Sequence, residues 1–395
     1  MLELIIDKNK EQETICLVEN GKLIEKYIDN EENKKNRLEG NIYVGKVVDL
    51  IHGMQAAFVD FGEGKNGFIH LKDAMPQVDE KIEKVDTSTE IKDILKPNQT
   101  LLVQVKKDSN EKKGARVSTH ISIPSKYIVY MPDTSFITIS QKIEDEKNKK
   151  ELINIVKENI KEGNGAIIRT SASKAGKEDI IKDIKNAEEK WDKILSEFNS
   201  KKVNSPKLLL ESESIVEKII LDLTDKKLEK ITVNDDKEYN KIKNLLEEQS
   251  NIKVILSKQK DILSMYDLIS QIEKCEKRKI WLNCGGFITI DKTEALTAID
   301  VNTGKFTGKK DLESTVFKVN KEATVEIVKQ LRLRDIGGII IIDYIDMHDE
   351  ENKKKIEELL KETLKEDRTK TQVEGFTRLN LMEMTRKHIC SHLDD

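Results

Sequence analysis

The fold of this chain is decided by two stretches, GFITIDKTEALTAIDVNTGK at residues 286–305 and GGIIIIDYIDM at residues 337–347. In the first, the apolar and partly β-branched run from Ala295 to Val301 precedes Thr303-Gly304, which predicts a strand that ends in a turn. The second is almost continuously apolar and predicts a strand buried on both faces. Between them, apolar residues recur at helical spacing, at Leu312, Val316, Val319, Ala323 and Ile327. This order of strand, helix and strand predicts a crossover that brings the two strand ends together.

Carboxylates and an amide lie at the ends of both predicted strands. Because side chains alternate along a strand, Asp300 and Asn302 point to the same face. Asp343 interrupts the second apolar run, where an ionised carboxylate is costly unless it is paired or binds a cation. Oxygen ligands of this kind suit Mg²⁺ or Mn²⁺, so Asp300 and Asp343 are candidate metal ligands. Asp346, three residues further on, would point to the opposite face of a continuous strand.

An ordinary structural role for these residues is the alternative. DVNTG (300–304) can form an Asx turn, and an aspartate at a strand end can cap the segment that follows. Positive charge for a nucleic-acid substrate would have to come from nearby basic residues, at Lys305, Lys309, Lys310, Arg332 and Arg334. Such residues are also typical of a solvated surface.

The whole chain is highly charged without being basic. Its 395 residues are 36% charged, yet the formal net charge is −4 and the pI is near 6.1. Nucleic-acid binding would therefore depend on local basic patches. The sequence begins without a basic region followed by an apolar one and contains no apolar run of about 20 residues, so we expect a cytoplasmic protein with no membrane span.

The cysteines do not predict a disulfide framework or a zinc site. They occur at Cys16, Cys275, Cys284 and Cys390, and no two of them form a C-x-x-C pair. His388, Cys390 and His392 alternate near the end of the sequence, but three potential ligands on a short polar segment do not make a closed tetrahedral site. We therefore predict no bound zinc.

Three segments together resemble the catalytic domain of the ribonuclease E/G family: TEALTAIDVNTG (293–304), QLRLRDIGGIIIIDYIDM (330–347) and LMEMTRKH (381–388). The resemblance implies a Mg²⁺-dependent endoribonuclease of RNA processing and decay that cleaves single-stranded RNA and leaves 5′-phosphate and 3′-hydroxyl ends. Asp300 and Asp343 would bind the metal, and Asn302 would orient Asp300 or the attacking water.

The resemblance is to ribonuclease G-like members and extends to Arg386-Lys387. The C-x-x-C element with which family members share zinc between subunits has no counterpart in the sequence, and neither has the small domain that follows it. A homodimer would therefore have to form without a zinc link, and the oligomeric state stays open.

The family implies a multidomain fold of the α+β and α/β classes. Residues 1–39 and 215–279 would form a ribonuclease H-like subdomain, structural because the carboxylates of a working ribonuclease H are not recognisable in it. Residues 40–123 would form an inserted S1 barrel of the OB type, and residues 124–214 a 5′-sensor region. Residues 280–395 would form a DNase I-like catalytic domain.

Residues 40–123 independently indicate a small barrel, because several short strands there are punctuated by glycine. Alternation puts Phe58 on the face opposite Ala57 and Val59, and it puts Phe68 opposite Ile69. Outward aromatic side chains on such a barrel stack on unpaired bases. The alternative is that both phenylalanines belong to the barrel core.

The family's RNA-contacting residues match three positions of that barrel, Phe58, Phe68 and Lys113. The 5′-sensor of the family matches further positions: Arg169 and Thr170 would hold the 5′-terminal phosphate, with Val129 as an apolar contact. Guanidinium binds phosphate in a bidentate fork, and a hydroxyl adds a neutral donor. Ser125 stands where the family usually has a glycine that approaches the terminal nucleotide, so the preference for particular 5′ ends is expected to differ.

Two rival functions follow from the same residues. The first is a non-catalytic S1-type RNA-binding protein with a vestigial nuclease domain, against which the intact set of Asp300, Asn302 and Asp343 argues. The second is a DNA nuclease, which stacking and phosphate contacts alone do not exclude.

Overall fold

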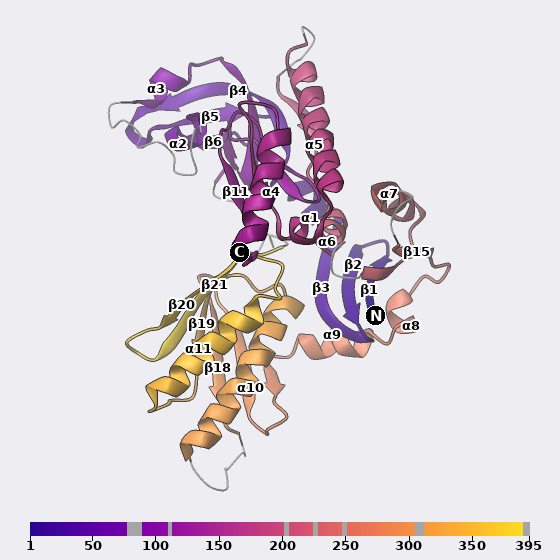
Figure 1. The fold of residues 1–395 in the computed structure, drawn as a ribbon, viewed down its shortest axis with the longest axis vertical. Coiled ribbons are helices and arrows are strands. Elements are labelled where there is room, and N and C mark those ends of the chain that lie inside the picture. Colours follow the sequence, from indigo (N-terminus) through magenta and orange to yellow (C-terminus); the bar gives the residue numbers. More distant parts are fainter. Residues whose placement is uncertain are drawn as a thin grey trace. The chain divides into compact units, whose positions relative to one another are not determined.

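The computed structural model describes the chain in seven stretches (Figure 1), residues 1–76, 89–109, 113–200, 205–223, 228–246, 251–304 and 312–389. The chain divides into two compact units. The first unit combines Met1–Glu31 with Lys226–Asp395, and the second, Glu32–Asp225, is inserted between these two parts. Helices and strands occur in both units, which makes the fold a mixed α+β fold.

The first unit contains a five-stranded sheet built from two distant parts of the chain. Its order is β15-β14-β1-β2-β3. β1 pairs antiparallel with β2 and parallel with β14. The strands are β1 (Leu2–Lys8), β2 (Gln12–Glu19), β3 (Lys22–Asn30), β14 (Leu228–Val233) and β15 (Lys253–Leu256). The helices that follow these strands are α7 (Asp236–Leu246), α8 (Ile262–Met265) and α9 (Ile269–Cys275).

A six-stranded sheet of order β16-β17-β18-β19-β21-β20 carries the candidate catalytic residues. Its strands are β16 (Lys279–Trp281), β17 (Phe287–Lys292), β18 (Thr297–Asn302), β19 (Gly338–Asp343), β20 (Thr371–Phe376) and β21 (Leu381–Arg386). β18 and β19 are parallel, and the connection between them contains α10 (Leu312–Leu333). The predicted strand, helix and strand are therefore confirmed.

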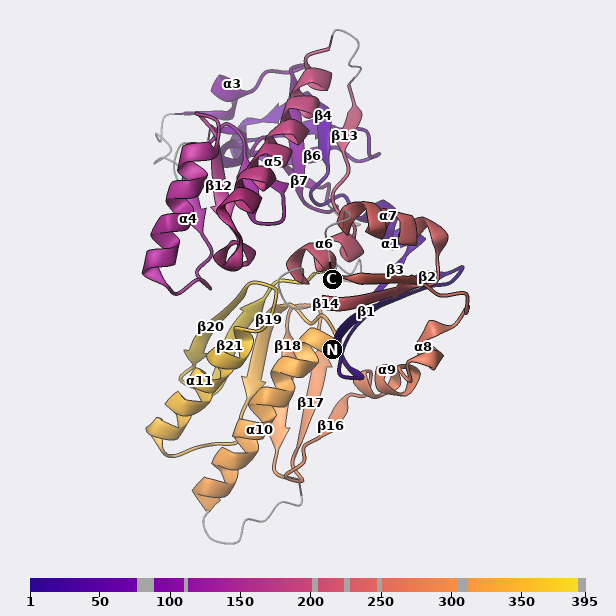
Figure 2. The ribbon, with the colours of Figure 1, turned by 45° about the vertical axis from the view of Figure 1, so that its right-hand side comes forward.

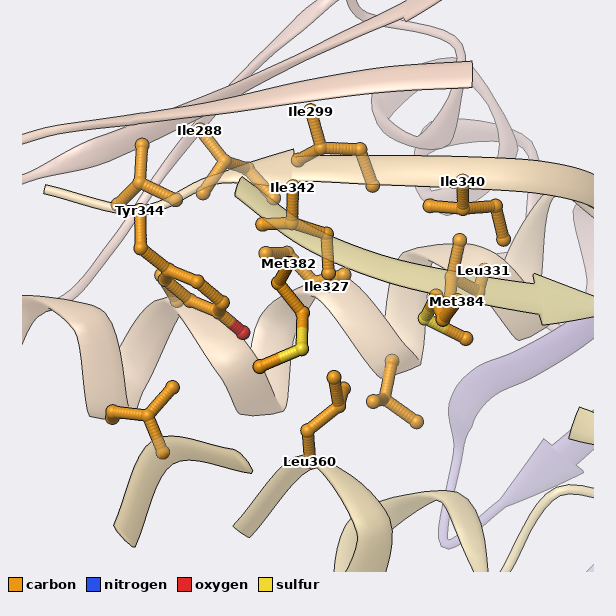
Figure 3. Close-up of a cluster of buried hydrophobic side chains, with 14 of the residues drawn as sticks. Ile288, Ile299, Ile327, Leu331, Ile340, Ile342, Tyr344, Leu360, Met382 and Met384 are labelled. Atoms are coloured by element: carbon orange, nitrogen blue, oxygen red, sulfur yellow. The ribbon is translucent and has the colours of Figure 1, made fainter. Parts of the chain in front are cut away.

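Among the described helices, those that pack on this sheet lie on one of its faces. Figures 1 and 2 both show α10 and α11 (Glu350–Leu364) along that face. The core beneath them (Figure 3) contains Ile299 and Ile342 from neighbouring strands, Ile327 from α10 and Leu360 from α11. The buried residues of the two strands alternate, and the residues between them point to the other, uncovered face; the buried ones are Ile299 and Val301 of β18 and Ile340 and Ile342 of β19.

Buried ion pairs join the two sheets of the first unit. The Glu25 carboxylate on β3 accepts hydrogen bonds from Arg368 at 2.7 Å and from Arg332 on α10 at 3.0 Å. Burial alone would raise the pKa of Glu25, but the two guanidinium groups outweigh it and hold the pKa below its usual value. A second buried arginine, Arg386, pairs with Asp335 and Asp367.

The second unit contains a closed five-stranded barrel. Its strands are β4 (Ile42–Ile51), β5 (Ala56–Asp60), β6 (Gly67–His70), β7 (Thr100–Lys107) and β8 (Arg116–Ser118). They follow the order β4-β5-β6-β8-β7, and pairing of β4 with β7 closes the ring. A sixth strand, β13 (Lys207–Leu210), adds to β4 from outside the ring. The barrel is consistent with the S1 type of OB fold.

A four-stranded sheet of order β11-β12-β10-β9 forms the rest of the second unit. Its strands are β9 (Ile123–Pro124), β10 (Ile128–Met131), β11 (Ile137–Ile139) and β12 (Gly165–Ile168). Its core includes apolar residues from α4 (Glu146–Asn159) and α5 (Lys177–Phe198). The shorter α6 (Ile215–Leu223) follows β13. Within the described stretches of both units, no helix is long and apolar enough to cross a membrane.

Candidate active site

Asp300 and Asp343 lie directly opposite each other in the parallel pairing of β18 and β19. Their neighbours Ile299 and Ile342 are buried in the core under α10, whereas both aspartates are exposed on the other face. The apolar run therefore positions the carboxylates, because burial of the isoleucines fixes which face the aspartates occupy. Two carboxylates from distant parts of the sequence meet at one edge of the sheet.

Asn302 supports one of these carboxylates. It is the last residue of β18 and shares a face with Asp300, as the alternation predicts. Its side-chain Nδ2 donates a hydrogen bond to Oδ2 of Asp300. The amide thereby restricts the orientation of the Asp300 carboxylate and leaves the other oxygen available.

Negative charge accumulates around Asp343. Its pKa is raised, first by partial burial and then by the charges of Asp300 and Asp346. β19 ends at Asp343, and Asp346 lies exposed in the irregular segment that follows. The expected continuous strand to residue 346 is therefore wrong, and alternation does not decide which way the Asp346 side chain points.

The charge of these aspartates is not neutralised by ion pairing within the described residues. Of the candidates for positive charge, Arg332 pairs with Glu25, and Arg334 donates to Gln330 and to the Lys277 carbonyl. Lys305, Lys309 and Lys310 lie outside the described residues. Arg332 and Arg334 thus make their side-chain contacts away from Asp300 and Asp343, and their contribution to the potential at this site stays a prediction.

A different arginine, Arg278, interacts electrostatically with Asp300. Arg278 binds Asp291 through two hydrogen bonds, which are the main reason that its pKa is raised, and the charge of Asp300 adds to the shift. Sequence reasoning missed Arg278, although it directly precedes β16 in the charged segment 276–279. In the described part of the chain, no group of three or more His, Cys, Asp or Glu side chains could enclose a metal. The arrangement seen there is a pair of carboxylates, Asp300 and Asp343.

Phe58 and Phe68 form a pair on the outside of the barrel. They are opposite each other on β5 and β6, with ring centroids 5.9 Å apart in an edge-to-face arrangement. Phe58 is 37% exposed, whereas its neighbours Ala57 and Val59 are fully buried, so the outward orientation predicted for Phe58 is confirmed. Phe68 is half-buried and also contacts the ring of His70 at 4.6 Å.

Lys113 lies two residues before Ala115, whose backbone pairs with that of Phe68. It is exposed and directly precedes Gly114, whose backbone packs against the Asn66 carbonyl so closely that a Cβ would lie 2.1 Å from that oxygen. The next residue, Ala115, accepts a hydrogen bond of 2.7 Å from the Phe68 backbone. The backbone two residues after Lys113 is thus held against the strand that carries Phe68.

The predicted 5′-sensor residues gather around the ends of β10 and β12. The Arg169 Nη1 donates to the Ser125 carbonyl at 2.9 Å, and the Thr170 hydroxyl lies 2.9 Å from that of Ser140. Val129 is half-buried, in register with Ile167 on β12. Alternation from Ile167 puts Arg169 on the same face as Val129.

Two acidic residues of this region were missed by sequence reasoning. Asp183 on α5 accepts a 2.6 Å hydrogen bond from the Ser125 hydroxyl and a 2.8 Å bond from the Tyr127 backbone, so the Ser125 side chain points inward. Asp222 on α6 forms an ion pair with Nη2 of Arg169. No local pattern marks either aspartate, because each meets its partner across more than 50 residues of sequence.

The histidine near the end of the described chain has a structural contact. His388 Nδ1 lies 3.0 Å from the Asp335 carbonyl oxygen, and the ring packs against Gly337. Cys390 and His392, the other two residues considered for zinc, lie outside the described residues.

Similarity to known proteins covers nearly the whole chain. The model of the Ribonuclease E/G family matches residues 122–389. Ribonuclease G of Salmonella typhimurium (strain SL1344) is 36% identical over 394 residues, which cover 98% of this chain and 79% of that protein. Ribonuclease G of Haemophilus influenzae is 36% identical over 400 residues, which cover 100% of this chain and 81% of that protein.

Similarity also extends to a longer relative, Ribonuclease E of Buchnera aphidicola subsp. Schizaphis graminum. It is 33% identical over 409 residues, which cover 100% of this chain and 41% of that protein. Together with the family match, this level of identity over this length leaves one conclusion. The chain belongs to the ribonuclease E/G family.

Proposed function

We propose that this endoribonuclease hydrolyses single-stranded RNA with Mg²⁺ held by Asp300 and Asp343, and that it favours 5′-monophosphorylated ends. The observation that carries the proposal is the direct pairing of the two aspartates on β18 and β19, with Asn302 bound to one of them. A protein that only bound RNA would not require two exposed carboxylates to lie opposite each other at the ends of neighbouring strands.

The residues present fit Mg²⁺. One or two carboxylates with open positions for water and phosphate oxygens are the usual protein contribution to a Mg²⁺ site, and Mn²⁺ accepts the same ligands. The like charges that raise the pKa of Asp343 also favour a cation between these side chains. When bound, the metal would activate a water and stabilise charge on the scissile phosphate. The hydrogen bond from Asn302 holds the Asp300 carboxylate in one orientation.

The barrel is the proposed site for the RNA strand. Phe58 and Phe68 present adjacent rings, and base stacking on such rings contributes about 1–3 kcal/mol per base. Lys113 is two residues from Ala115, whose backbone pairs with that of Phe68, and its ammonium group would meet the phosphate backbone. In this proposal the barrel is the S1 domain of the family.

The 5′ end is proposed to bind at Arg169 and Thr170, with Val129 against the terminal nucleotide. Arg169 is oriented by the Ser125 carbonyl and by Asp222. The Ser125 hydroxyl is engaged by Asp183, so Ser125 would contribute its backbone to the pocket. This leaves the guanidinium group and the Thr170 hydroxyl as the phosphate donors.

The remaining assignments complete the proposal. The first sheet, with the segments 1–39 and 215–279, is assigned as the ribonuclease H-like subdomain, residues 124–214 as the 5′-sensor, and 280–395 as the DNase I-like domain. We further propose a cytoplasmic enzyme of RNA processing and decay that binds no zinc. Elemental analysis of the purified chain tests the last point, because one zinc per one or two chains would contradict it.

A cleavage assay tests the central proposal. The substrate is a 5′-monophosphorylated, single-stranded, A/U-rich oligonucleotide incubated with the protein and either Mg²⁺ or EDTA. We expect cleavage with Mg²⁺, none with EDTA, and a loss of at least about 100-fold in Asp300→Asn and Asp343→Asn. Glu383→Gln is the matched control, because Glu383 is an exposed carboxylate on the same face of the same sheet.

Each rival function has its own outcome in this assay. Binding without cleavage in the wild type, or cleavage that survives both aspartate substitutions, would support the non-catalytic RNA-binding protein or another active site. An all-deoxy oligonucleotide cut at the same rate would indicate a DNA nuclease.

A further inference from the structure

The uncovered face of the six-stranded sheet carries an exposed aromatic side chain that the proposed reaction does not use. Trp281 on β16 is 60% exposed. It is in register with Phe287 on β17, and the ring centroids are 5.3 Å apart in an edge-to-face arrangement. Neither ring belongs to the core under α10, which instead contains Ile288 from the opposite face of β17. The pair therefore presents apolar area to solvent in place of packing.

A cation accompanies the two rings. Lys279 Nζ lies 3.5 Å from the ring centroid of Phe287 and 4.2 Å from that of Trp281. The ammonium group thus covers Phe287, while most of the Trp281 ring remains accessible. An aromatic surface with a positive charge at its margin is complementary to a nucleotide, which offers a π-face and a phosphate together.

The register of the sheet places this surface beside the catalytic residues. On β17, Phe287 pairs with Asn302 and Thr289 pairs with Asp300, so Phe287 is two residues from the position opposite the carboxylate. At Gly304, just beyond β18, a Cβ would lie 3.4 Å from Phe287 and 3.5 Å from Trp281. Both rings therefore lie against the turn that follows Asn302.

We propose that Trp281, supported by Phe287 and Lys279, is a stacking platform for an unpaired base of the RNA substrate next to the scissile phosphate. The inference rests on the proposed function, since it assigns a substrate-positioning residue to that site. A base stacked on Trp281 directs the adjoining phosphate toward Asp300 and Asp343. Because purines offer the larger π-face, the platform favours adenine or guanine over uracil at the stacked position.

Tryptophan fluorescence provides a direct test. The chain has two tryptophans, and the other, Trp191, is 6% exposed. Titration with a single-stranded RNA oligonucleotide in EDTA should quench the emission of the wild-type protein. The same titration of Trp281→Phe should leave the emission of Trp191 unchanged. Equal quenching in both proteins would overturn the proposal.

Kinetics with matched substrates test whether the stacked base matters for cleavage. Trp281→Ala should lower kcat/KM by about 5- to 150-fold, the range of one base stack, whereas Trp281→Phe should stay within about threefold of the wild type. A set of oligonucleotides, each with one abasic nucleotide, tests the stacked position. At one position, loss of the base should lower kcat/KM of the wild type and leave kcat/KM of Trp281→Ala unchanged. Thermal unfolding of each variant checks that the fold is retained.

The outcomes separate this inference from the function on which it rests. Normal cleavage by Trp281→Ala, with the wild type active, would overturn the platform and leave the proposed function intact. Quenching by RNA with no cleavage by the wild type in Mg²⁺ would support the platform and contradict the nuclease.

Discussion

Arg169 and Asp222 form an ion pair within the second unit, although 53 residues separate them in the sequence. Each side chain is about one-quarter exposed. In the proposed 5′-sensor, the carboxylate of Asp222 therefore binds the same guanidinium group that an incoming phosphate would bind. The terminal phosphate has to share or displace an anion that the protein itself supplies.

Asp222→Asn is expected to strengthen the preference for 5′-monophosphorylated RNA. Removing the competing charge should raise kcat/KM for a 5′-monophosphorylated oligonucleotide about 3- to 10-fold and leave the value for its 5′-hydroxyl counterpart unchanged. The ratio of the two rates is the measurement. Glu178→Gln, an exposed acidic position at the start of α5, is the control. An equal gain on both substrates would show that Asp222 acts by general repulsion of RNA.

Asp346→Asn should weaken the use of Mg²⁺ without abolishing cleavage. The charge of Asp346 acts on Asp343, yet Asp346 is not in register with the pair on β18 and β19. A residue that orients or charges a ligand typically changes metal affinity by about 10-fold. The Mg²⁺ concentration that gives half-maximal cleavage should rise by that factor. A loss as large as that expected for Asp343→Asn would make Asp346 a third ligand.

Phe58→Ala and Phe68→Ala should each weaken RNA binding by about 5- to 150-fold, the equivalent of one lost base stack. Phe58→Trp keeps an outward ring and should bind as the wild type does. Fluorescence anisotropy of a labelled single-stranded oligonucleotide in EDTA measures binding apart from cleavage. The pair would be a structural element of the barrel if Phe58→Ala lowered the midpoint of thermal unfolding and left affinity unchanged.

The buried Glu25 makes the stability of the first unit sensitive to acid. Its pKa lies below the usual value in the folded state, as does the pKa of Asp367 beside Arg386, so both carboxyls bind protons more weakly when folded than when unfolded. Their contribution is therefore complete above about pH 5 and is lost as the pH falls below about 4. Urea unfolding midpoints at pH 7, 5 and 3.5 should show little change over the first interval and a marked drop over the second.

Glu25→Gln should remove most of that dependence. At pH 7 it should lower the free energy of unfolding by about 3 kcal/mol, because Arg332 and Arg368 would remain buried without their carboxylate. The difference from the wild type should shrink as the pH falls toward 3.5, because protonation of Glu25 in the unfolded state then offsets part of what its ionised carboxylate contributes to the folded state. Lys26, the neighbour of Glu25 on β3, pairs with the exposed Glu276. Glu276→Gln removes that partner and should change the free energy of unfolding by less than about 1 kcal/mol. Equal effects of the two substitutions would contradict this account.

The six-stranded sheet that carries the candidate site was largely predictable because its signals are local. The apolar runs fixed β18, β19 and the stripe of α10, and alternation along β18 put Asp300 and Asn302 on one face. The end of this strand was misjudged because the run GGIIIIDYIDM stays apolar past the point where the strand ends at Asp343. Composition does not mark that end, since Tyr344 and Met347 continue into the core without strand pairing.

Contacts across long sequence separations were not predictable. Nothing near Asp222 indicates Arg169, and nothing near Asp183 indicates that it binds the Ser125 hydroxyl. Trp281 was missed for another reason. The short runs KIW and FIT were not recognised as the paired strands β16 and β17, which the loop LNCGG joins into a hairpin. Alternation within that hairpin would have placed Trp281 and Phe287 on the face of Asp300. The division into four domains and the roles of the site residues stay predictions.

The insertion of the second unit between β3 and β14 sets an order for folding on the ribosome. β1 pairs with β14, and Ile5 shares a core with Ile262 and Leu333, so the first sheet cannot be completed until those residues emerge. Roughly 200 residues intervene, a delay of about 10–40 s at ordinary rates of synthesis. Meanwhile the barrel that is proposed to bind RNA has all of its strands. The nascent chain would therefore be able to bind RNA before it is able to cleave RNA.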